Sequence, residues 1–270
     1  DSILNPRHAG TYGGTAESLP QGGGVINLTV GGTLCVNGRA TAGLADSSRG
    51  RPGGAGTLNI TAARLEGTGS ISANGSIRNV KDGTYYGASG GGRVSVRLTD
   101  PEATFSEYWK SAINAKGGYT SLATLLATNS SSAGTVYLQS GAEAEAQGTV
   151  IVRNDNNVLS NVAFTPIPSR VQGGENDVFS KVSFLVEDCG RINLFETMQI
   201  ESLSLEANTV LNCNGYTLTV RRMTTGGAPV GRGTYTSGSS LFTSGYLLDT
   251  SVGATGALIV LGEPSLISIR

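Results

Sequence analysis

Charged side chains are scarce in this chain of 270 residues. Asp, Glu, Lys and Arg together supply 14% of the residues, whereas an average globular domain has roughly 25%. The formal net charge is −1, so the charge does not favour nucleic acid or an acidic membrane surface as a partner. The chain also lacks any apolar run of about 18 residues, which argues against a membrane-spanning helix.

Histidine and cysteine are rarer still. His8 is the single histidine, so a Ser-His-Asp or Cys-His mechanism would have to use it, and a multi-histidine metal site is impossible. The three cysteines, Cys35, Cys189 and Cys213, form no CxxC pair and no metal-ligand spacing. Cys189 and Cys213 lie far enough apart to occupy neighbouring turns of a stacked chain, which would allow a disulfide between them, but buried free thiols are the favoured alternative.

Glycine, in contrast, is abundant: its 40 positions are about twice its usual share. Many of these glycines belong to a phrase in which glycine is followed by any residue, an apolar residue, a polar residue and an apolar residue. Four copies occupy residues 24–28, 56–60, 92–96 and 134–138. The alternation indicates a short β-strand with one buried face, and four copies indicate a repeat.

A second phrase, again an alternating strand closed by glycine, follows the first at residues 34–38, 71–75 and 113–117. The stretches between a second phrase and the next first phrase, such as 39–55 and 76–91, are rich in glycine, serine and aspartate. They are predicted to be surface loops that leave the stack and return to it.

One such strand cannot bury a core alone, so each repeat needs the next one stacked upon it. Parallel stacking of the first phrases predicts two columns of inward side chains, and the second phrases predict a third column on another face. The three columns are Ile26, Leu58, Val94 and Val136; Leu28, Ile60, Val96 and Leu138; and Leu34, Ile71 and Ile113.

The remainder of the chain divides by composition. Residues 1–22 show no periodicity and are predicted to be an irregular lead-in, and 101–112 is predicted to be a short helix or a packed loop. Residues 142–222 keep strand patterns without the glycine-rich loops and are predicted to continue the same stack. Residues 223–270, which are rich in glycine again, are predicted to cover the exposed strand edge at the end of the stack.

These phrases resemble the glycine-rich β-solenoid repeats of large secreted or surface-attached bacterial proteins. The matching segments are 22–28, 65–75, 90–96 and 133–138. Residues 211–220 followed by 233–236 resemble a pattern found near the C-termini of autotransporter passenger regions. The resemblance implies an exported parallel β-helix that serves as a stalk, adhesin or surface layer, and it implies no catalytic set.

Parallel β-helices also carry polysaccharide lyases and hydrolases, so we considered an enzyme. Arg93 and Arg97 are predicted to face outward on one strand, where they would suit an acidic sugar, and Lys81 with Asp82 lies in the adjoining loop. A lyase needs a base and a cation, and a hydrolase needs two carboxylates facing one groove. No second acidic cluster accompanies these residues, so solvated cations on the strand face are favoured over a catalytic site.

Two further groups of residues are weak ligand candidates. Tyr85, Tyr86, Tyr108 and Trp109 are the paired aromatics and could stack on a sugar face, although packing of the loops on the wall is favoured. Oxygen ligands for calcium could come from a set of acidic and amide side chains: Glu187, Asp188, Asp155, Asn154, Asn156 and Asn157. The Asp-x-Asp-x-Asp-Gly loop and the glycine-rich calcium nonapeptide are both missing, and hydrogen-bonded turns are favoured.

The sequence therefore predicts an all-β chain, a right-handed parallel β-helix over residues 1–222 with glycine-rich repeats at 22–141 and plainer coils at 142–222, followed by a β-rich cap at 223–270. The predicted function is a non-catalytic structural or adhesive module of a large secreted or cell-surface bacterial protein, without a cofactor. Its expected partners are other segments of a parent chain, a surface glycan or further copies. The alternatives are a carbohydrate-active or glycan-binding β-helix and a protomer of an extracellular filament or layer.

Overall fold

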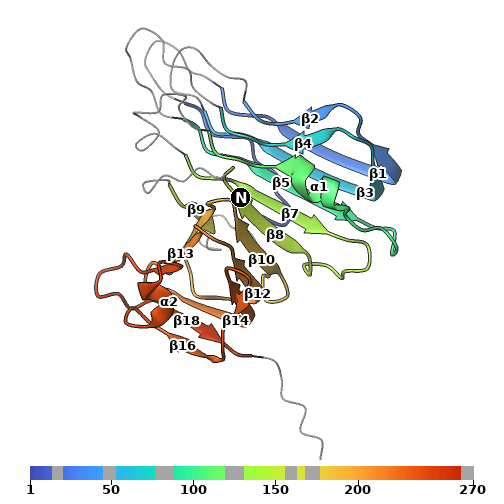
Figure 1. The fold of residues 1–270 in the computed structure, drawn as a ribbon. Coiled ribbons are helices and arrows are strands. Elements are labelled where there is room, and N and C mark those ends of the chain that lie inside the picture. Colours follow the sequence, from blue (N-terminus) through green and yellow to red (C-terminus); the bar gives the residue numbers. More distant parts are fainter. Residues whose placement is uncertain are drawn as a thin grey trace, which may run out of the picture.

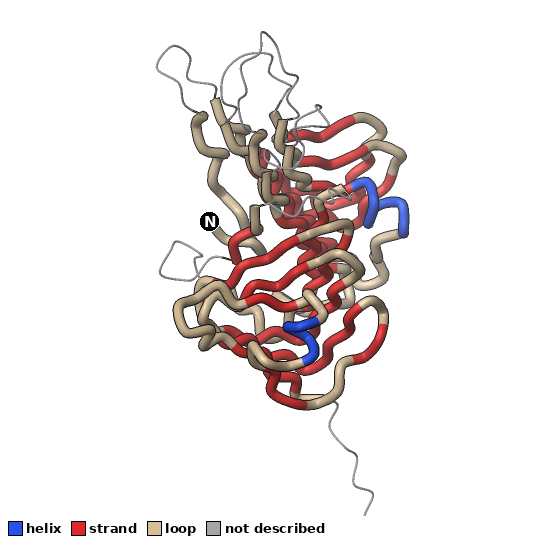
Figure 2. The backbone as a smooth tube through the Cα atoms, turned by 60° about the vertical axis from the view of Figure 1, so that its left-hand side comes forward, coloured by secondary structure: helices blue, strands red, loops and turns tan. Residues whose placement is uncertain are grey.

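The fold is built almost entirely of β-strands, most of which pair in parallel (Figure 1). The computed structural model describes residues 1–13, 21–44, 53–76, 88–118, 131–155, 163–167 and 177–262. Within them, strands stack one upon another from β1 at one end of the molecule to β18 and β16 at the other, and Figure 2 shows this stack from a second direction. The all-β class predicted from the sequence is confirmed.

The described strands form three sheets. An 11-stranded sheet has the order β1-β3-β5-β7-β8-β10-β12-β14-β18-β16, with β15 paired to β14. Its strands are β1 (Val25–Cys35), β3 (Thr57–Glu66), β5 (Arg93–Leu98), β7 (Thr135–Gln139), β8 (Thr149–Arg153), β10 (Ser183–Glu187), β12 (Met198–Leu205), β14 (Thr217–Thr225), β15 (Ala228–Pro229), β16 (Gly233–Tyr235) and β18 (Ala257–Val260).

The two smaller sheets flank the large one. A three-stranded sheet contains β2 (Arg39–Thr41), β4 (Ser70–Ser72) and β6 (Ile113–Asn114). A four-stranded sheet contains β9 (Thr165–Ile167), β11 (Arg191–Leu194), β13 (Val210–Asn212) and β17 (Leu247–Leu248). Two helices complete the described elements, α1 (Glu107–Ala112) and α2 (Ser240–Thr243), and neither is long and apolar enough to cross a membrane.

The first two predicted columns are confirmed by the strand register. β1, β3, β5 and β7 pair in parallel, so that the apolar residues of the four glycine phrases lie opposite one another. The alternation of side chains in a strand then places one set of positions on the core face. The two confirmed columns are Ile26, Leu58, Val94 and Val136, and Leu28, Ile60, Val96 and Leu138.

The third predicted column was wrong in its first member. Ile71 pairs with Ile113 as expected, but the residue opposite Ile71 in the first repeat is Ala40, and Leu34 pairs with Leu65 instead. The reason is that β1 does not end after its first phrase. It continues through an irregularity between Val30 and Thr33, which keeps Leu34 in the large sheet and delays the second strand.

One step of the large sheet departs from the single parallel stack that the sequence predicts over residues 1–222. β7 and β8 pair antiparallel, with Val136 opposite Ile151 and Tyr137 opposite Val150. The strands before this step are parallel to one another, and β8, β10, β12, β14 and β18 are again parallel to one another. The short connection from β7 to β8 makes this a hairpin, which reverses the strand direction.

The reversal also moves the hydrophobic core to the other face of the sheet. Val136, Leu138 and Ile151 pack in the core beneath the three-stranded sheet, which we call the N-terminal core. Tyr137 and Val150 pack with the side chains of the four-stranded sheet, in the C-terminal core. Since neighbouring residues of one strand point to opposite faces, the two cores lie on opposite sides of one continuous sheet.

The predicted helix or packed loop at 101–112 contains α1, which begins after the N-cap Ser106. The Ser106 side chain accepts a hydrogen bond from the backbone N–H of Trp109, as an N-cap serine does. Trp109 is buried in the N-terminal core. The helix therefore serves to bring the only tryptophan of the chain onto the core.

The C-terminal end of the sheet is covered by antiparallel strands. β18 adds to β14 in parallel, β16 pairs antiparallel with β18 on the outside, and β15 folds back on β14. Residues after 222 thus contribute the antiparallel strands β15 and β16 and also another pair of stacked parallel strands, β17 and β18. At the opposite end β1 has no strand beyond it within the described residues.

Candidate functional site

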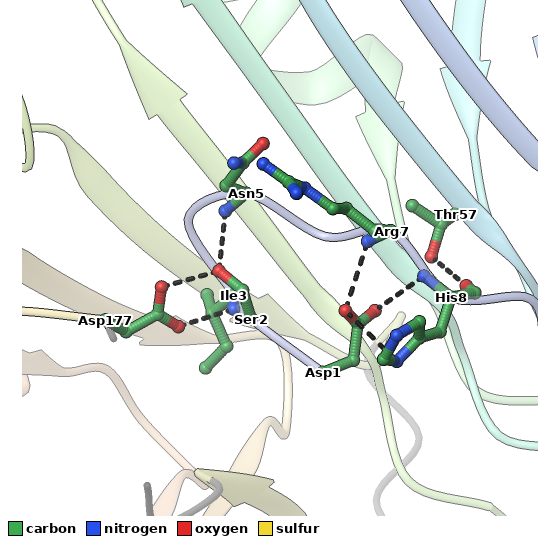
Figure 3. Close-up of polar contacts among 8 residues, drawn as sticks. All are labelled: Asp1, Ser2, Ile3, Asn5, Arg7, His8, Thr57 and Asp177. Carbon is green, nitrogen blue, oxygen red and sulfur yellow. Dashed lines mark hydrogen bonds and ion pairs between the residues drawn. The ribbon is translucent and has the colours of Figure 1, made fainter. Parts of the chain in front are cut away.

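The N-terminal residues 1–13, which we call the strap, cross the face of the large sheet that is opposite the N-terminal core. Asp177 holds the start of the strap, because its carboxylate oxygens accept hydrogen bonds from Ser2 Oγ at 2.5 Å and from the Ile3 backbone N–H at 2.6 Å (Figure 3). Ile3 and Leu4 are buried in the C-terminal core. The segment predicted to be an irregular lead-in is therefore anchored through both polar and apolar contacts.

Further along, the strap lies over the polar face of β3 and β5. Ser95 Oγ donates to the Leu4 carbonyl at 2.7 Å, and Thr57 Oγ1 donates to the His8 carbonyl at 2.7 Å. Asn59 Nδ2 donates to Asn5 Oδ1 at 2.7 Å. The polar residues of the alternating strands are thus hydrogen-bonded to the strap.

Arg97 belongs to this hydrogen-bonded layer. Its Nη2 lies 3.1 Å from Asn59 Oδ1 and 3.4 Å from both Asn5 Oδ1 and Thr61 Oγ1. All three acceptors are neutral. Arg97 faces away from the N-terminal core, as the alternation predicts, but the strap covers it, so it is not the solvated cation that the sequence favoured.

Arg93 lies nearby on the same strand, β5, and is also half-buried. Nη1 donates to Thr135 Oγ1 at 3.2 Å, and no carboxylate of the described residues lies within 4.0 Å of the guanidinium. Burial lowers the pKa of Arg93 to about 10, although the charge of Asp177 opposes the shift. Arg93 is half-buried, and partial removal of a cation from water is costly when its hydrogen bond goes to a neutral hydroxyl.

Two cavities adjoin the strap. One of about 670 Å³ lies beside its first half and is lined by polar and charged side chains, among them Arg7, Glu145, Asp177 and Lys181. The other, of about 320 Å³, is lined by His8, Arg93 and the backbone of three glycine stretches, 54–56, 90–92 and 132–134. Arg93 and Asp177 therefore each border a space that a small polar ligand could enter.

The carboxyl group of Asp177 is expected to make the stability of the protein depend on pH. Burial raises the pKa of Asp177, against hydrogen bonds from Ser2 and from the backbone of Ile3 and Leu4 and the charge of Arg93. An acid whose pKa is higher in the folded state stabilises the fold below its unfolded pKa of about 3.9. That contribution is lost as the pH rises through the raised folded value.

Asp177→Asn, which cannot ionise, is therefore expected to remove part of the fall in unfolding free energy as the pH rises from about 3 upward. Urea unfolding of both proteins over a pH series measures the difference. Asp155→Asn is the matched control, since Asp155 is an exposed carboxylate paired with Lys116 at the surface. A wild-type protein that gains stability relative to Asp177→Asn with rising pH would contradict the prediction.

The aromatic candidates separate into two groups. Tyr85 and Tyr86, together with Lys81 and Asp82, lie outside the described residues. Trp109 is buried, and Tyr108 stacks edge-on against it at 5.4 Å between ring centroids. Tyr108 is 45% exposed, and its hydroxyl is within hydrogen-bond distance of the Thr68 and Gly69 carbonyl oxygens. The pair thus holds α1 onto the turn before β4, and one face of Tyr108 stays accessible.

The residues considered for calcium lie in separate polar contacts. Asp155 pairs with Lys116 at 2.7 Å and Glu187 with Arg153 at 3.4 Å, while Asn154 bonds to the backbone of Gly117 and Ser131. Asn156 and Asn157 lie outside the described residues. In the part of the chain that the structure describes, no three His, Cys, Asp or Glu side chains are grouped to hold a metal ion.

The single histidine, His8, and the three cysteines differ in exposure, and all three cysteines are free thiols. His8 is exposed, and its Nδ1 lies 3.6 Å from Asp1 Oδ1. Cys189 and Cys213 are buried free thiols, as favoured from the sequence, and Cys35 is an exposed free thiol. Burial raises the pKa of Cys213 to about 12 and also raises that of Cys189, so both thiols are held in their unreactive protonated form.

The sequence did not identify the strap or Asp177 as part of a site. Their contact joins residues 175 positions apart, and neither segment has a periodic pattern. The adjacent apolar pair Ile3 and Leu4 was the one available signal that the lead-in is packed. Sequence reasoning did single out Arg93 and Arg97, and the structure places Arg97 in contact with the strap and Arg93 beside a cavity that strap residues line.

The comparisons with known proteins add no family to this description. No model of a protein family matches the chain, and neither curated proteins nor solved structures gave a match.

Proposed function

We propose that this chain is a non-catalytic structural and adhesive module of a large secreted or cell-surface bacterial protein. In this proposal each of the two parallel strand stacks is a segment of right-handed parallel β-helix. The strand direction and the side of the core both reverse between β7 and β8. Reversing both the strand direction and the side of the core is equivalent to a half-turn about the axis along which the strands stack. A rotation does not change handedness, so the crossover connections have the same hand in both segments.

The observation that carries the proposal is the continuous backbone ladder. Thr57 N donates to Gly24 O at 2.9 Å, Arg93 N to Gly56 O at 3.0 Å and Thr135 N to Gly92 O at 3.1 Å. The same bond therefore recurs at the start of β3, β5 and β7. Hydrogen bonds that run along the stacking axis stiffen the molecule in that direction, which suits a stalk or a surface layer.

The contacts of Arg97 also support a structural role. Arg97 is engaged by Asn5, Asn59 and Thr61, and these contacts fasten the strap to the sheet. A lyase would instead pair its cation with a base that faces an open groove. Arg97 therefore fits a residue that positions the strap better than one that meets a substrate.

A glycan array followed by product analysis on every hit tests the proposal. We expect that any polysaccharide bound by the protein is recovered with its chain length unchanged and without new reducing or unsaturated ends. Release of products that is lost in both Arg93→Met and Asp177→Asn would overturn the non-catalytic proposal. Products that persist in both variants would point to a contaminating enzyme, and an independently purified preparation then decides.

Glycan binding is the second candidate, and the cavity of about 670 Å³ favours it. A concave space with both charge signs and several hydrogen-bonding groups suits a polar, uncharged or mildly acidic sugar. Lys181 lines this cavity, so Lys181→Ala is expected to weaken any glycan found on the array by about tenfold. Lys110→Ala, which alters a surface lysine paired with Glu107 on α1, is the matched control and should leave the affinity unchanged.

A further inference from the structure

Within the described residues the sheet is open beyond β1, whereas β3, β5 and β7 each have a strand on both sides. In one column Ile26 is 37% exposed, while Leu58, Val94 and Val136 are exposed by 0%, 0% and 1%. In the other, Leu28 is 36% exposed, while Ile60, Val96 and Leu138 are exposed by 1%, 0% and 5%. The same apolar position is therefore buried three times and exposed once. The exposed copy belongs to β1, which Figure 1 shows at the end of the stack.

The glycine that begins the phrase shows the same contrast. A Cβ on Gly56 would lie 2.0 Å from Gly24 O, one on Gly92 1.9 Å from Gly56 O, and one on Gly134 1.7 Å from Gly92 O. Each later strand thus needs glycine because the preceding backbone passes too closely for a side chain. A Cβ on Gly24 would meet no atom within 4 Å. Gly24 therefore leaves room for one more backbone against β1.

The backbone of β1 has hydrogen-bonding groups to offer to such a neighbour. Gly24 O bonds to Thr57 N, and the ladder of a parallel pair uses alternate residues of each strand. Ile26 and Leu28 then bond to β3, and the N–H and C=O groups of Val25, Asn27 and Thr29 point to the free edge. A long, flat edge strand with an apolar face is a template for pairing with another chain.

Charge and symmetry point to a second copy of this chain as the occupant. β1 contains no charged residue, so two β1 strands can approach without repulsion between their own side chains. The opposite end of the sheet finishes with the antiparallel strand β16, which has 3 residues against the 11 of β1, so the two ends are poorly matched for head-to-tail growth. The arrangement that remains is a closed two-fold dimer in which the β1 edges of two copies pair with each other.

We propose that β1 pairs antiparallel with β1 of a second copy, around a two-fold axis perpendicular to the sheet. Only this axis keeps the core face of one sheet continuous with the core face of the other, because an axis along the strands would turn one core face outward. Ile26 and Leu28 of both copies would then be covered and the two N-terminal cores joined. The proposal goes beyond the proposed function and holds or fails independently of glycan binding.

Light scattering coupled to size exclusion tests the pairing over a wide range of protein concentration. We expect twice the mass of one chain at high concentration and a shift to the single mass on dilution. Ile26→Lys with Leu28→Lys places charge at the open end of the columns, and Thr29→Pro removes a free-edge N–H without a bond to β3. Each variant is expected to raise the dissociation midpoint by at least about tenfold.

Val252→Lys is the control for added charge, because Val252 is fully exposed and far along the chain from β1; its midpoint should not change. Circular dichroism and thermal unfolding of the diluted proteins show whether each variant is folded. If the double lysine variant is unfolded, Thr29→Pro still tests the proposed pairing. Hydrogen exchange gives the direct readout: the amides of Val25, Asn27 and Thr29 should be protected only in the dimer.

A wild-type protein with the mass of one chain at every concentration would overturn the proposal. A mass that keeps rising with concentration beyond that of two chains would also overturn it, since larger assemblies would require the β16 end of the sheet to pair as well. A dimer that is unaffected by the β1 variants, or whose β1 amides exchange as fast as in the monomer, would place the interface elsewhere and overturn it as well.

Discussion

Replacing Gly92 with alanine (Gly92→Ala) is expected to lower the free energy of unfolding by at least about 3 kcal/mol, the upper end of the usual range for overpacked cores. The added Cβ would lie 1.9 Å from Gly56 O and 3.0 Å from two carbonyl carbons. All of these atoms belong to the backbone of the neighbouring strand, and Gly56 O also accepts the Arg93 N–H. No side chain can move to relieve the clash, so the ladder itself must separate. Urea unfolding followed by circular dichroism measures the loss.

Gly24→Ala is the matched control, because Gly24 begins the same phrase and its Cβ would meet no atom. Its unfolding free energy should change by less than about 1 kcal/mol, with any gain coming from the stiffer unfolded chain. The comparison is made at low protein concentration, since Gly24 lies at the proposed interface between copies. Equal losses in the two variants would contradict the stacking explanation for these glycines.

Replacing Tyr137 with alanine (Tyr137→Ala) is expected to cost about 3–5 kcal/mol of the unfolding free energy, as for other large buried aromatics. Tyr137 is 1% exposed and fills the C-terminal core from β7, whose neighbouring residues face the other core. The same change would loosen the packing of Ile3 and Leu4 in that core. Proteolysis of the strap and chemical unfolding are therefore expected to report the loss together.

Two controls separate the ring from the hydroxyl and from general effects. Tyr137→Phe loses only the hydrogen bonds to Gln139 and Gly148 and should cost about 0.5–1.5 kcal/mol. Tyr108→Ala removes a half-exposed ring and should cost clearly less than Tyr137→Ala. If Tyr137→Ala left the strap as resistant to proteolysis as in the wild-type protein, Tyr137 would not join the strap to the sheet.

The register of the first four long strands was predictable because each strand carries the same alternating phrase. A shift by one residue would expose Leu58, Ile60, Val94 and Val96 to solvent, so the hydrophobic pattern strongly selects the observed pairing. The wrong position of Leu34 shows where this argument ends. The phrase states which residues face inward, but it does not state where a strand ends when an irregularity lets it continue.

The reversal between β7 and β8 was not predictable from the same patterns. An alternating strand has two faces, and Tyr137, which stands at the polar position of the phrase, carries a large ring that can also be buried. Either face of β7 can therefore serve a core. Val150 and Val152 look the same in the sequence whether they extend the first core or begin a second one. Only the contact of these residues with β10 and the four-stranded sheet decides the face.

The candidate site was predictable only in part. Arg93 and Arg97 stand at outward positions of a strand, and this places them on the polar face without further knowledge. Their environment depends on the strap, which Asp177 and the buried Ile3 hold across the sheet. Since that contact joins distant and non-periodic segments, the partial burial of Arg93 and the two neighbouring cavities could not be inferred.

The sequence by itself determined the all-β class, the parallel stacking of four glycine phrases and the residues of the two main columns, because short-period patterns and close backbone contacts are local properties. The tertiary structure decided on which side of the sheet the core lies from β8 onward, where the strand direction turns, what covers Arg97 and which end of the stack stays open. These features depend on contacts between segments far apart in the chain, and a local pattern carries no information about which distant partner it meets.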